Sequence, residues 1–130
     1  MDRPKFFKIR IDDAPTRKMN LGRGTSIKLV NGETGGRNVD VHINLLNEDS
    51  GPGEIHYHAH AENVYVVLEG TLEVVIEGER HLLGPGEVGW IAPGVVHTAG
   101  NAGLGGITRI LEIYAPAGED FHALPDWPRK

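Results

Sequence analysis

Histidines recur at alternate positions in the segment EIHYHAHAENVYVVLEG, residues 54–70. Side chains two residues apart on a β-strand point to the same side, so the imidazoles of His56 and His58 are expected to lie together. His97, in WIAPGVVHTAGN, is the candidate for a third ligand, because Pro93-Gly94 predicts a turn just before it. Three neutral imidazoles suit a divalent metal such as iron, manganese, nickel or zinc. The alternative is an exposed polar loop, because short patterns often match by accident.

The segments around these histidines resemble short strands separated by turns that contain glycine or proline. In NVDVHINLL, residues 38–46, apolar residues alternate with Asp, His and Asn, which predicts a strand with one buried face. Eight or so such strands, without a convincing helix, predict an all-β jelly-roll barrel. The other predicted strands are VYVVLEG (64–70), TLEVVIEG (71–78), ERHLLG (79–84), GEVGWIAPG (86–94) and ITRILEIYAP (107–116).

The chain of 130 residues is long enough for a single domain. We expect a barrel core over about residues 40–115, an N-terminal strand arm in residues 1–30 and an irregular tail over residues 116–130. The formal charge of -5 provides no basic face for nucleic acid or membrane lipid, so small molecules are the expected partners. No stretch has the length of a signal peptide or membrane span, which makes the cytoplasm the default location. KFFKIRI, residues 5–11, could pair with a second copy, which predicts a homodimer.

Two separated motifs give the chain a specific resemblance. The first motif, Gly51 to Gly70, contains the histidine pair, and the second, Gly86 to Asn101, contains His97. Over about residues 40–115 the chain resembles a small single-domain cupin. This resemblance implies a jelly-roll barrel in which the motif histidines bind a divalent metal, together with a glutamate in the family's pattern.

Asn63 holds the position of the family's glutamate. The implied ligand set is then three histidines with a neutral amide oxygen, or three histidines alone, which leaves the metal a stronger Lewis acid. Glu62 is adjacent, but strand alternation points it away from Asn63 unless a bulge follows His58. His60 has the same parity as the histidine pair and is a further alternative.

Several other side chains are candidates for proton transfer or substrate contact. His42 lies on the polar face of its predicted strand, where it would line the cavity or face solvent, and His42 or Glu62 could act as acid or base. Arg109, a charge inside an apolar strand, either reaches solvent or presents its guanidinium to an anionic substrate. Aromatic residues could wall the pocket, although in a small barrel they are often plain core. These candidates are Tyr65, Trp90 and Phe121.

The resemblance implies a small-molecule function without fixing the reaction. Three histidines without a carboxylate resemble the ligand set of cupin dioxygenases, which slightly favours dioxygen chemistry. The segment EIYAPAGEDFHAL, residues 112–124, resembles that of small cupins that isomerise or open unsaturated uronates, so redox-neutral sugar-acid chemistry is the alternative. A non-catalytic binding or storage protein is the third, and its metal site would be closed to further ligands.

Overall fold

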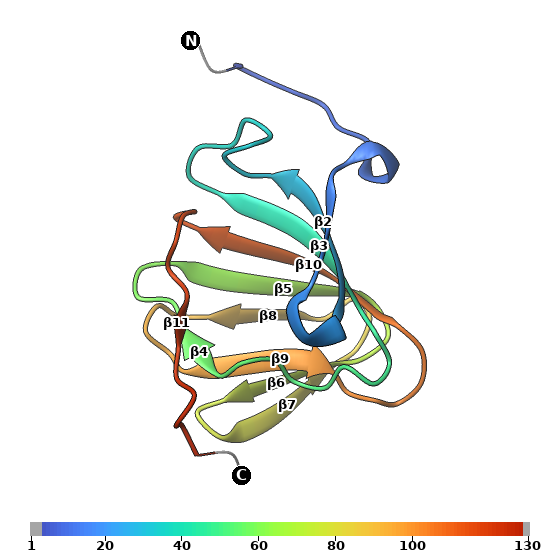
Figure 1. Cartoon of the computed structure of the whole chain (residues 1–130), viewed down its shortest axis with the longest axis vertical. Helices are drawn as coiled ribbons and strands as arrows, with labels where there is room; N and C mark the ends of the chain where they lie inside the picture. Colours follow the sequence, from blue (N-terminus) through green and yellow to red (C-terminus); the bar gives the residue numbers. More distant parts are fainter. Residues whose placement is uncertain (1–3, 129–130) are drawn as a thin grey trace.

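Two antiparallel β-sheets face each other in the computed structural model, which describes residues 4–128 (Figure 1). The strand order is β1-β2-β3-β10-β5-β8 in the six-stranded sheet and β11-β4-β9-β6-β7 in the five-stranded sheet. This arrangement confirms the prediction of an all-β jelly-roll barrel. The strands are β1 (Thr16–Lys18), β2 (Gly24–Val30), β3 (Asp40–Leu46), β4 (His56–Tyr57), β5 (Glu62–Glu69), β6 (Leu72–Ile76), β7 (Glu79–Leu83), β8 (Val88–Ile91), β9 (His97–Asn101), β10 (Thr108–Ala115) and β11 (His122–Ala123).

The two ends of the chain differ from the expectation. Residues 5–10 form no strand, and the N-terminal strands are β1 and β2 instead, with the short 3-10 helices η1 (Ile11–Asp13) and η2 (Asn20–Gly22) before and after β1. The tail is less irregular than predicted, because β11 pairs with β4 and runs along one side of the barrel (Figure 1). Neither helix in the described part of the chain is long and apolar enough to cross a membrane.

Strand β3 is buried on both faces, so the expectation of a single buried apolar face is wrong. Its polar residues Asp40, His42 and Asn44 are buried toward the space between the sheets. The apolar residues point outward, where Ile43 packs against Ala14 and Leu29 in a separate core cluster. The N-terminal segment therefore covers the outer face of β3 and leaves the polar face to line the interior.

The space between the sheets is divided into an apolar part and a polar part. The inward-facing residues of one strand belong to both parts, according to their position along it: in β5, Val67 lies in the core while Asn63 lies at the polar end beside Glu112, and in β10 Ile110 and Glu112 are divided in the same way. Burying one such aliphatic side chain stabilises the fold by roughly 1.5–3 kcal/mol. The core residues are Leu46, Tyr65, Val67, Leu72, Val74, Ile91 and Ile110.

A glycine lets the chain pass closely over β9 on its way to the histidine pair. Pro52 forms a bridge with Gly100, and a Cβ on Gly100 would collide with the backbone of Gly51. Only glycine allows two backbones to approach this closely. The crossing fixes the path of the segment that leads into β4.

Candidate metal centre

Three imidazoles converge at the polar end of the barrel. His56 on β4 is the direct cross-strand partner of His97 at the start of β9, and His58 follows β4 by one residue. The ring centroids lie 4.3 Å apart for His56 and His97, 4.9 Å for His56 and His58, and 5.4 Å for His58 and His97. One nitrogen from each ring lies within 4.8 Å of the others. The structure thus brings together the three histidines that the spacing singled out.

Backbone carbonyls orient all three rings. Nδ1 of His56 lies 2.8 Å from the Glu54 carbonyl oxygen, Nδ1 of His58 lies 2.8 Å from that of Asp120, and Nδ1 of His97 lies 2.9 Å from that of Val95. A carbonyl only accepts, so each Nδ1 carries the hydrogen and each Nε2 keeps its lone pair. Such bonds to the second nitrogen are typical of metal-binding histidines.

The surroundings keep two of these rings neutral. Burial, together with repulsion from the neighbouring imidazoles, lowers the pKa of His56 to about 4. Burial also lowers the pKa of His97. A neutral imidazole is the form that binds a metal, so neither ring has to lose a proton at neutral pH.

Asn63 points into this end of the barrel and Glu62 does not. Asn63 is completely buried, and its Nδ2 donates to Oε2 of Glu112 at 3.0 Å. Glu62 is exposed on the outer face, where it accepts a hydrogen bond of 2.9 Å from Trp90 Nε1. His60 is exposed as well. The regular alternation of β5, without a bulge that reverses it, explains this division.

Two buried polar atoms at the centre support its fit to a metal ion. Nε2 of His97 and Oδ1 of Asn63 have no hydrogen-bond partner in the structure, although buried polar atoms are almost always paired. Both are lone-pair donors. Three neutral imidazoles and an amide oxygen therefore fit a divalent cation, and nothing in this set selects among iron, manganese, nickel and zinc.

A chain of buried charges lies beside the histidines. His42 Nδ1 is 2.6 Å from Asp40 Oδ1, and His42 Nε2 is 2.8 Å from Glu112 Oε1. Burial by itself would lower the pKa of His42, but its hydrogen bonds to the two carboxylates raise it to about 9. Burial would likewise raise the pKa of Glu112, but the bonds from His42 and Asn63 lower it to about 2. At neutral pH this is an imidazolium between two carboxylates.

Glu112 joins the charged chain to the metal centre. Its Oε1 also accepts a bond of 3.0 Å from Asn44 Nδ2, while its Oε2 holds the amide of Asn63. Sequence reasoning missed Glu112 and Asp40, although both carried a signal. Glu112 is a charge inside an apolar strand, as Arg109 is, and Asp40 lies two residues from His42 on the same face.

A cavity of about 660 Å³ opens at this end of the barrel. Of the four residues that the sequence suggested for substrate contact, two line this cavity and two lie on the outer surface. Tyr65 and Phe121 line the cavity, and the Phe121 ring stacks on His56 with centroids 4.2 Å apart. Trp90 and Arg109 do not line it. Trp90 is 60% exposed, and Arg109 alternates with the inward-facing Ile110, so both belong to the outer face.

The C-terminal tail closes the histidine side of the cavity. The carboxylate of Asp120 accepts hydrogen bonds from the backbone N–H groups of residues 59, 60 and 61 at 2.8, 2.8 and 3.0 Å, and its carbonyl orients His58. His122 stacks on Tyr57 with centroids 4.9 Å apart. Asp120 thus positions one of the three clustered histidines from 62 residues away in the sequence.

Solved structures with this fold include proteins of several kinds. The polyketide cyclase RemF from Streptomyces resistomycificus is 22% identical, with a TM-score of 0.76 over 95% of this chain and 89% of that chain. KdgF from a Halomonas species is 16% identical, with a TM-score of 0.70 over 83% and 91%. A cupin-superfamily sugar phosphate isomerase from Silicibacter pomeroyi is 20% identical, with a TM-score of 0.71 over 85% and 76%. Identities this low show a common fold and no more.

Family membership comes from the sequence match. No curated protein matches the chain in sequence. The family model of the cupin domain, however, matches residues 46–114, which is more than half of the chain and includes all three histidines. The chain therefore belongs to the cupin family.

Proposed function

We propose that the protein is a metal-dependent enzyme that moves protons on a small carbonyl or hydroxyl compound without net oxidation, as in isomerisation or the opening or closing of a ring. The observation that carries this proposal is that His42 and Glu112 line the same cavity as His56 and His58, with Asp40 bonded to His42 from behind. Paired acid and base groups next to a metal ion are the requirement for such chemistry.

The metal would be held by His56, His58 and His97 with the amide oxygen of Asn63. When bound, it supplies a Lewis acid that polarises a substrate oxygen. Phe121 stacks on His56 and covers one face of that ring. The carbonyl bonds at each Nδ1 keep the imidazoles in place, so the protein's ligands need little rearrangement.

His42 is the proposed proton store. Its Nε2 holds a proton on the bond to Oε1 of Glu112, and its high pKa keeps that proton in place at neutral pH. A proton can pass along this bond toward the cavity and return to Nε2. The exposed position of Glu62 gives it no such path, so it is not part of the proposal.

Relatives of the same fold are consistent with redox-neutral chemistry, by analogy alone. Two of the structures similar to this chain are named as a polyketide cyclase and a sugar phosphate isomerase. Both names describe rearrangements without net oxidation.

A dioxygenase is the second candidate, and one specific observation favours it. The buried residue beside the three histidines is the neutral Asn63 instead of a carboxylate, which is the feature that led the sequence to favour dioxygen chemistry. Glu112 weakens this argument for a dioxygenase, because its carboxylate on the neighbouring strand places a negative charge next to Asn63.

Proton exchange separates the candidates. Protein loaded with iron, manganese, nickel or zinc in D₂O would be mixed with sugar phosphates, uronates and β-diketones, and exchange of carbon-bound hydrogen followed by NMR. We expect exchange in the wild type, its loss in His42→Gln, and its retention in Lys8→Gln, which changes an exposed charge outside the cavity. Substrate-dependent oxygen consumption by the iron-loaded protein, and by none of the other three metal forms, would instead establish the dioxygenase. Binding of these substrates without hydrogen exchange or oxygen uptake would indicate a non-catalytic binding protein.

A further inference from the structure

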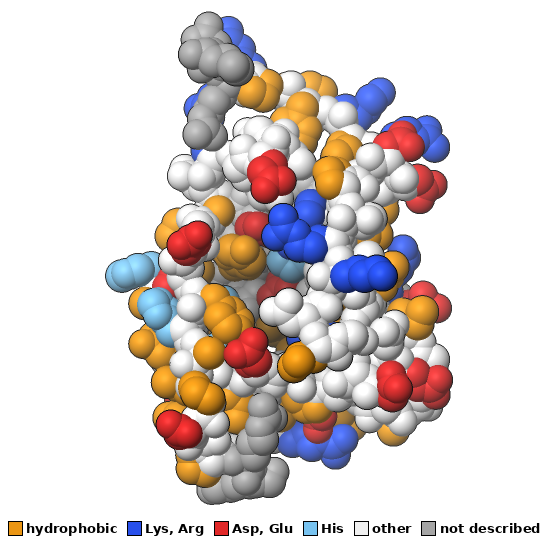
Figure 2. All heavy atoms as spheres, viewed as in Figure 1, with side chains coloured by type: hydrophobic (Ala, Val, Ile, Leu, Met, Phe, Trp, Pro, Cys, Tyr) orange, Lys and Arg blue, Asp and Glu red, His pale blue; other side chains and the backbone are white. Residues whose placement is uncertain are grey.

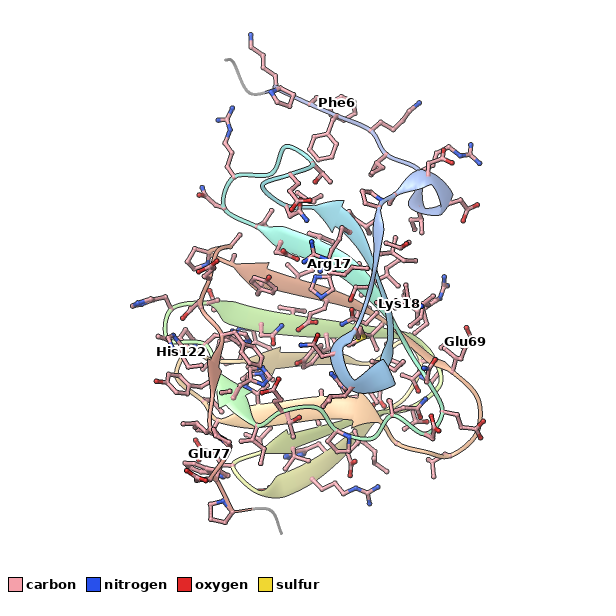
Figure 3. All side chains as sticks on the ribbon, viewed as in Figure 1. Phe6, Arg17, Lys18, Glu69, Glu77 and His122 are labelled. Atoms are coloured by element: carbon pink, nitrogen blue, oxygen red, sulfur yellow. The ribbon has the colours of Figure 1, made fainter. Side chains whose placement is uncertain are left out.

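One wall of the cavity is basic although the whole chain carries a formal charge of -5. Arg17 and Lys18 on β1 and Lys28 on β2 line it. Figure 2 shows Lys and Arg side chains gathered on one side of a hollow, and Figure 3 shows Arg17 and Lys18 on β1, across the opening from His122 on the tail. Within residues 4–128, none of these three cations takes part in an ion pair.

The other charges that line the cavity are paired or lie elsewhere. Arg23 donates from Nη2 to a backbone carbonyl at 2.8 Å, and Glu112 is paired with the imidazolium described above. Asp120 accepts three backbone hydrogen bonds. Glu54 and Glu119 are exposed and belong to the segments that flank the histidine side. Counting Arg23, which directly precedes β2 and whose Nε has no hydrogen-bond partner within residues 4–128, the positive charge of the cavity that lacks an acidic partner lies on residues 17–28.

Strand register gives the separation between this wall and the reacting groups. Lys28, His42 and Glu112 are successive cross-strand partners on β2, β3 and β10, and Glu112 pairs in turn with Tyr65 on β5. Neighbouring strands lie about 4.8 Å apart, so the backbone of Lys28 lies about 10 Å from that of Glu112 and about 15 Å from β5. The cavity of about 660 Å³ spans this separation.

We propose that the cavity binds an elongated anionic molecule whose carboxylate or phosphate group contacts Arg17 and Lys28 while its reacting oxygen lies at the three-histidine end. This inference rests on the proposed function only for the reacting end. Arginine pairs with both anions through two parallel hydrogen bonds, and lysine adds a point charge. The anion contact that was one of two alternatives for Arg109, on the interior strand β10, is proposed instead for β1 and β2 at one edge of the sheet.

Titration calorimetry with matched linear probes tests the proposal on metal-loaded protein. Suberate carries a carboxylate at each end, octanoate has the same length with one carboxylate, and 8-phosphonooctanoate replaces one carboxylate with a phosphonate. We expect suberate or 8-phosphonooctanoate to bind at least about tenfold more tightly than octanoate, because only these place an anion at the basic wall. The stronger of the two identifies the anion.

Two variants locate the anion. Arg17→Gln combined with Lys28→Gln should remove the preference for the dianion and leave the metal content unchanged, whereas Lys8→Gln should retain the preference. Equal binding of suberate and octanoate by the wild type, or an unchanged preference in the double variant, would overturn the inference. Failure of the proposed function would give a different result. His58→Ala would then retain its metal and bind octanoate like the wild type, and the preference for the dianionic probes over octanoate would persist.

Discussion

Protonation of His42 should stabilise the fold at neutral pH and cease to do so in alkaline solution. The pKa of His42 is raised from 6.5 to about 9 by the two carboxylates that bond its ring nitrogens. A tenfold difference in proton affinity is worth about 1.4 kcal/mol. The rise in the pKa of His42 from 6.5 to about 9 therefore adds about 3 kcal/mol to the free energy of unfolding while the ring is protonated in both states. The side chain is only 8% exposed, so solvent screens this interaction little.

The sign follows from comparing the folded and unfolded states. Below pH 6.5 both states hold the proton, and the full stabilisation is present. Between pH 6.5 and about 9 the unfolded chain releases the proton while the folded protein keeps it, so the stabilisation declines as the pH rises. Above about pH 9 it is lost. The pKa of Glu112 is lowered to about 2, so this carboxylate keeps its charge throughout the range and adds no slope of its own.

Urea unfolding at intervals from pH 6 to pH 10, with a chelator present, measures this decline as a fall in the midpoint at constant slope. The control is His42→Gln, which retains a hydrogen-bonding amide but cannot titrate. Its unfolding free energy should be lower at pH 7 and should vary less with pH. A parallel NMR titration reports the imidazole pKa of the wild type directly. A wild-type midpoint that is flat over the whole range, with a His42 pKa near 6.5, would refute the reasoning.

Four further predictions concern the metal centre, the backbone and the N-terminal segment. His58→Ala should abolish stoichiometric metal binding measured by plasma mass spectrometry, while the exposed His81→Ala should not; one metal per chain in His58→Ala would remove His58 from the ligand set. Asn63→Glu should lower the melting temperature of the metal-free protein, because it places a second carboxylate against Glu112. Added metal should raise the melting temperature of this variant more than that of the wild type. An equal rise in both proteins would place residue 63 away from the metal. Gly100→Ala should destabilise the fold by about 1–3 kcal/mol through collision with Gly51, with Gly32→Ala as a comparison at a turn glycine that has open space around it and no positive φ; an unchanged urea midpoint in Gly100→Ala would contradict the close approach. Phe6→Ser, at a side chain that is 83% exposed, should weaken the expected homodimer in sedimentation without altering the melting temperature, and an unaltered profile would count against pairing through this segment.

The cluster of three histidines could be predicted from the sequence in part because the geometry of its first two members is local. His56 and His58 are two residues apart, and alternation along a strand is enough to place them together. The same rule correctly separated Asn63 from Glu62. Six of the strands were also readable, since each lies between turns that contain glycine, proline or other turn-forming residues: β3, β5, β6, β7, β8 and β10.

The polar cavity could not be read in the same way, because it depends on which face of a strand points inward. In β3 the apolar face is covered by the N-terminal segment, so alternation alone left His42 undecided between cavity and solvent. The basic wall was missed for a related reason. Arg17 and Lys28 line the cavity only because β1 and β2 pair at the edge of the sheet, and this pairing could not be predicted from the sequence.

The contact between His58 and Asp120 sets an order of events during synthesis. Residues 59–61 and the ring of His58 are held by a residue that lies 62 positions later, beyond the last long strand. A chain that has emerged only as far as Pro116 already contains β1 to β10, but it lacks the groups that orient one of the three ligands. The ring of His58 can therefore take its observed orientation only after the tail has been made, although the strands that carry the other two histidines are complete before then.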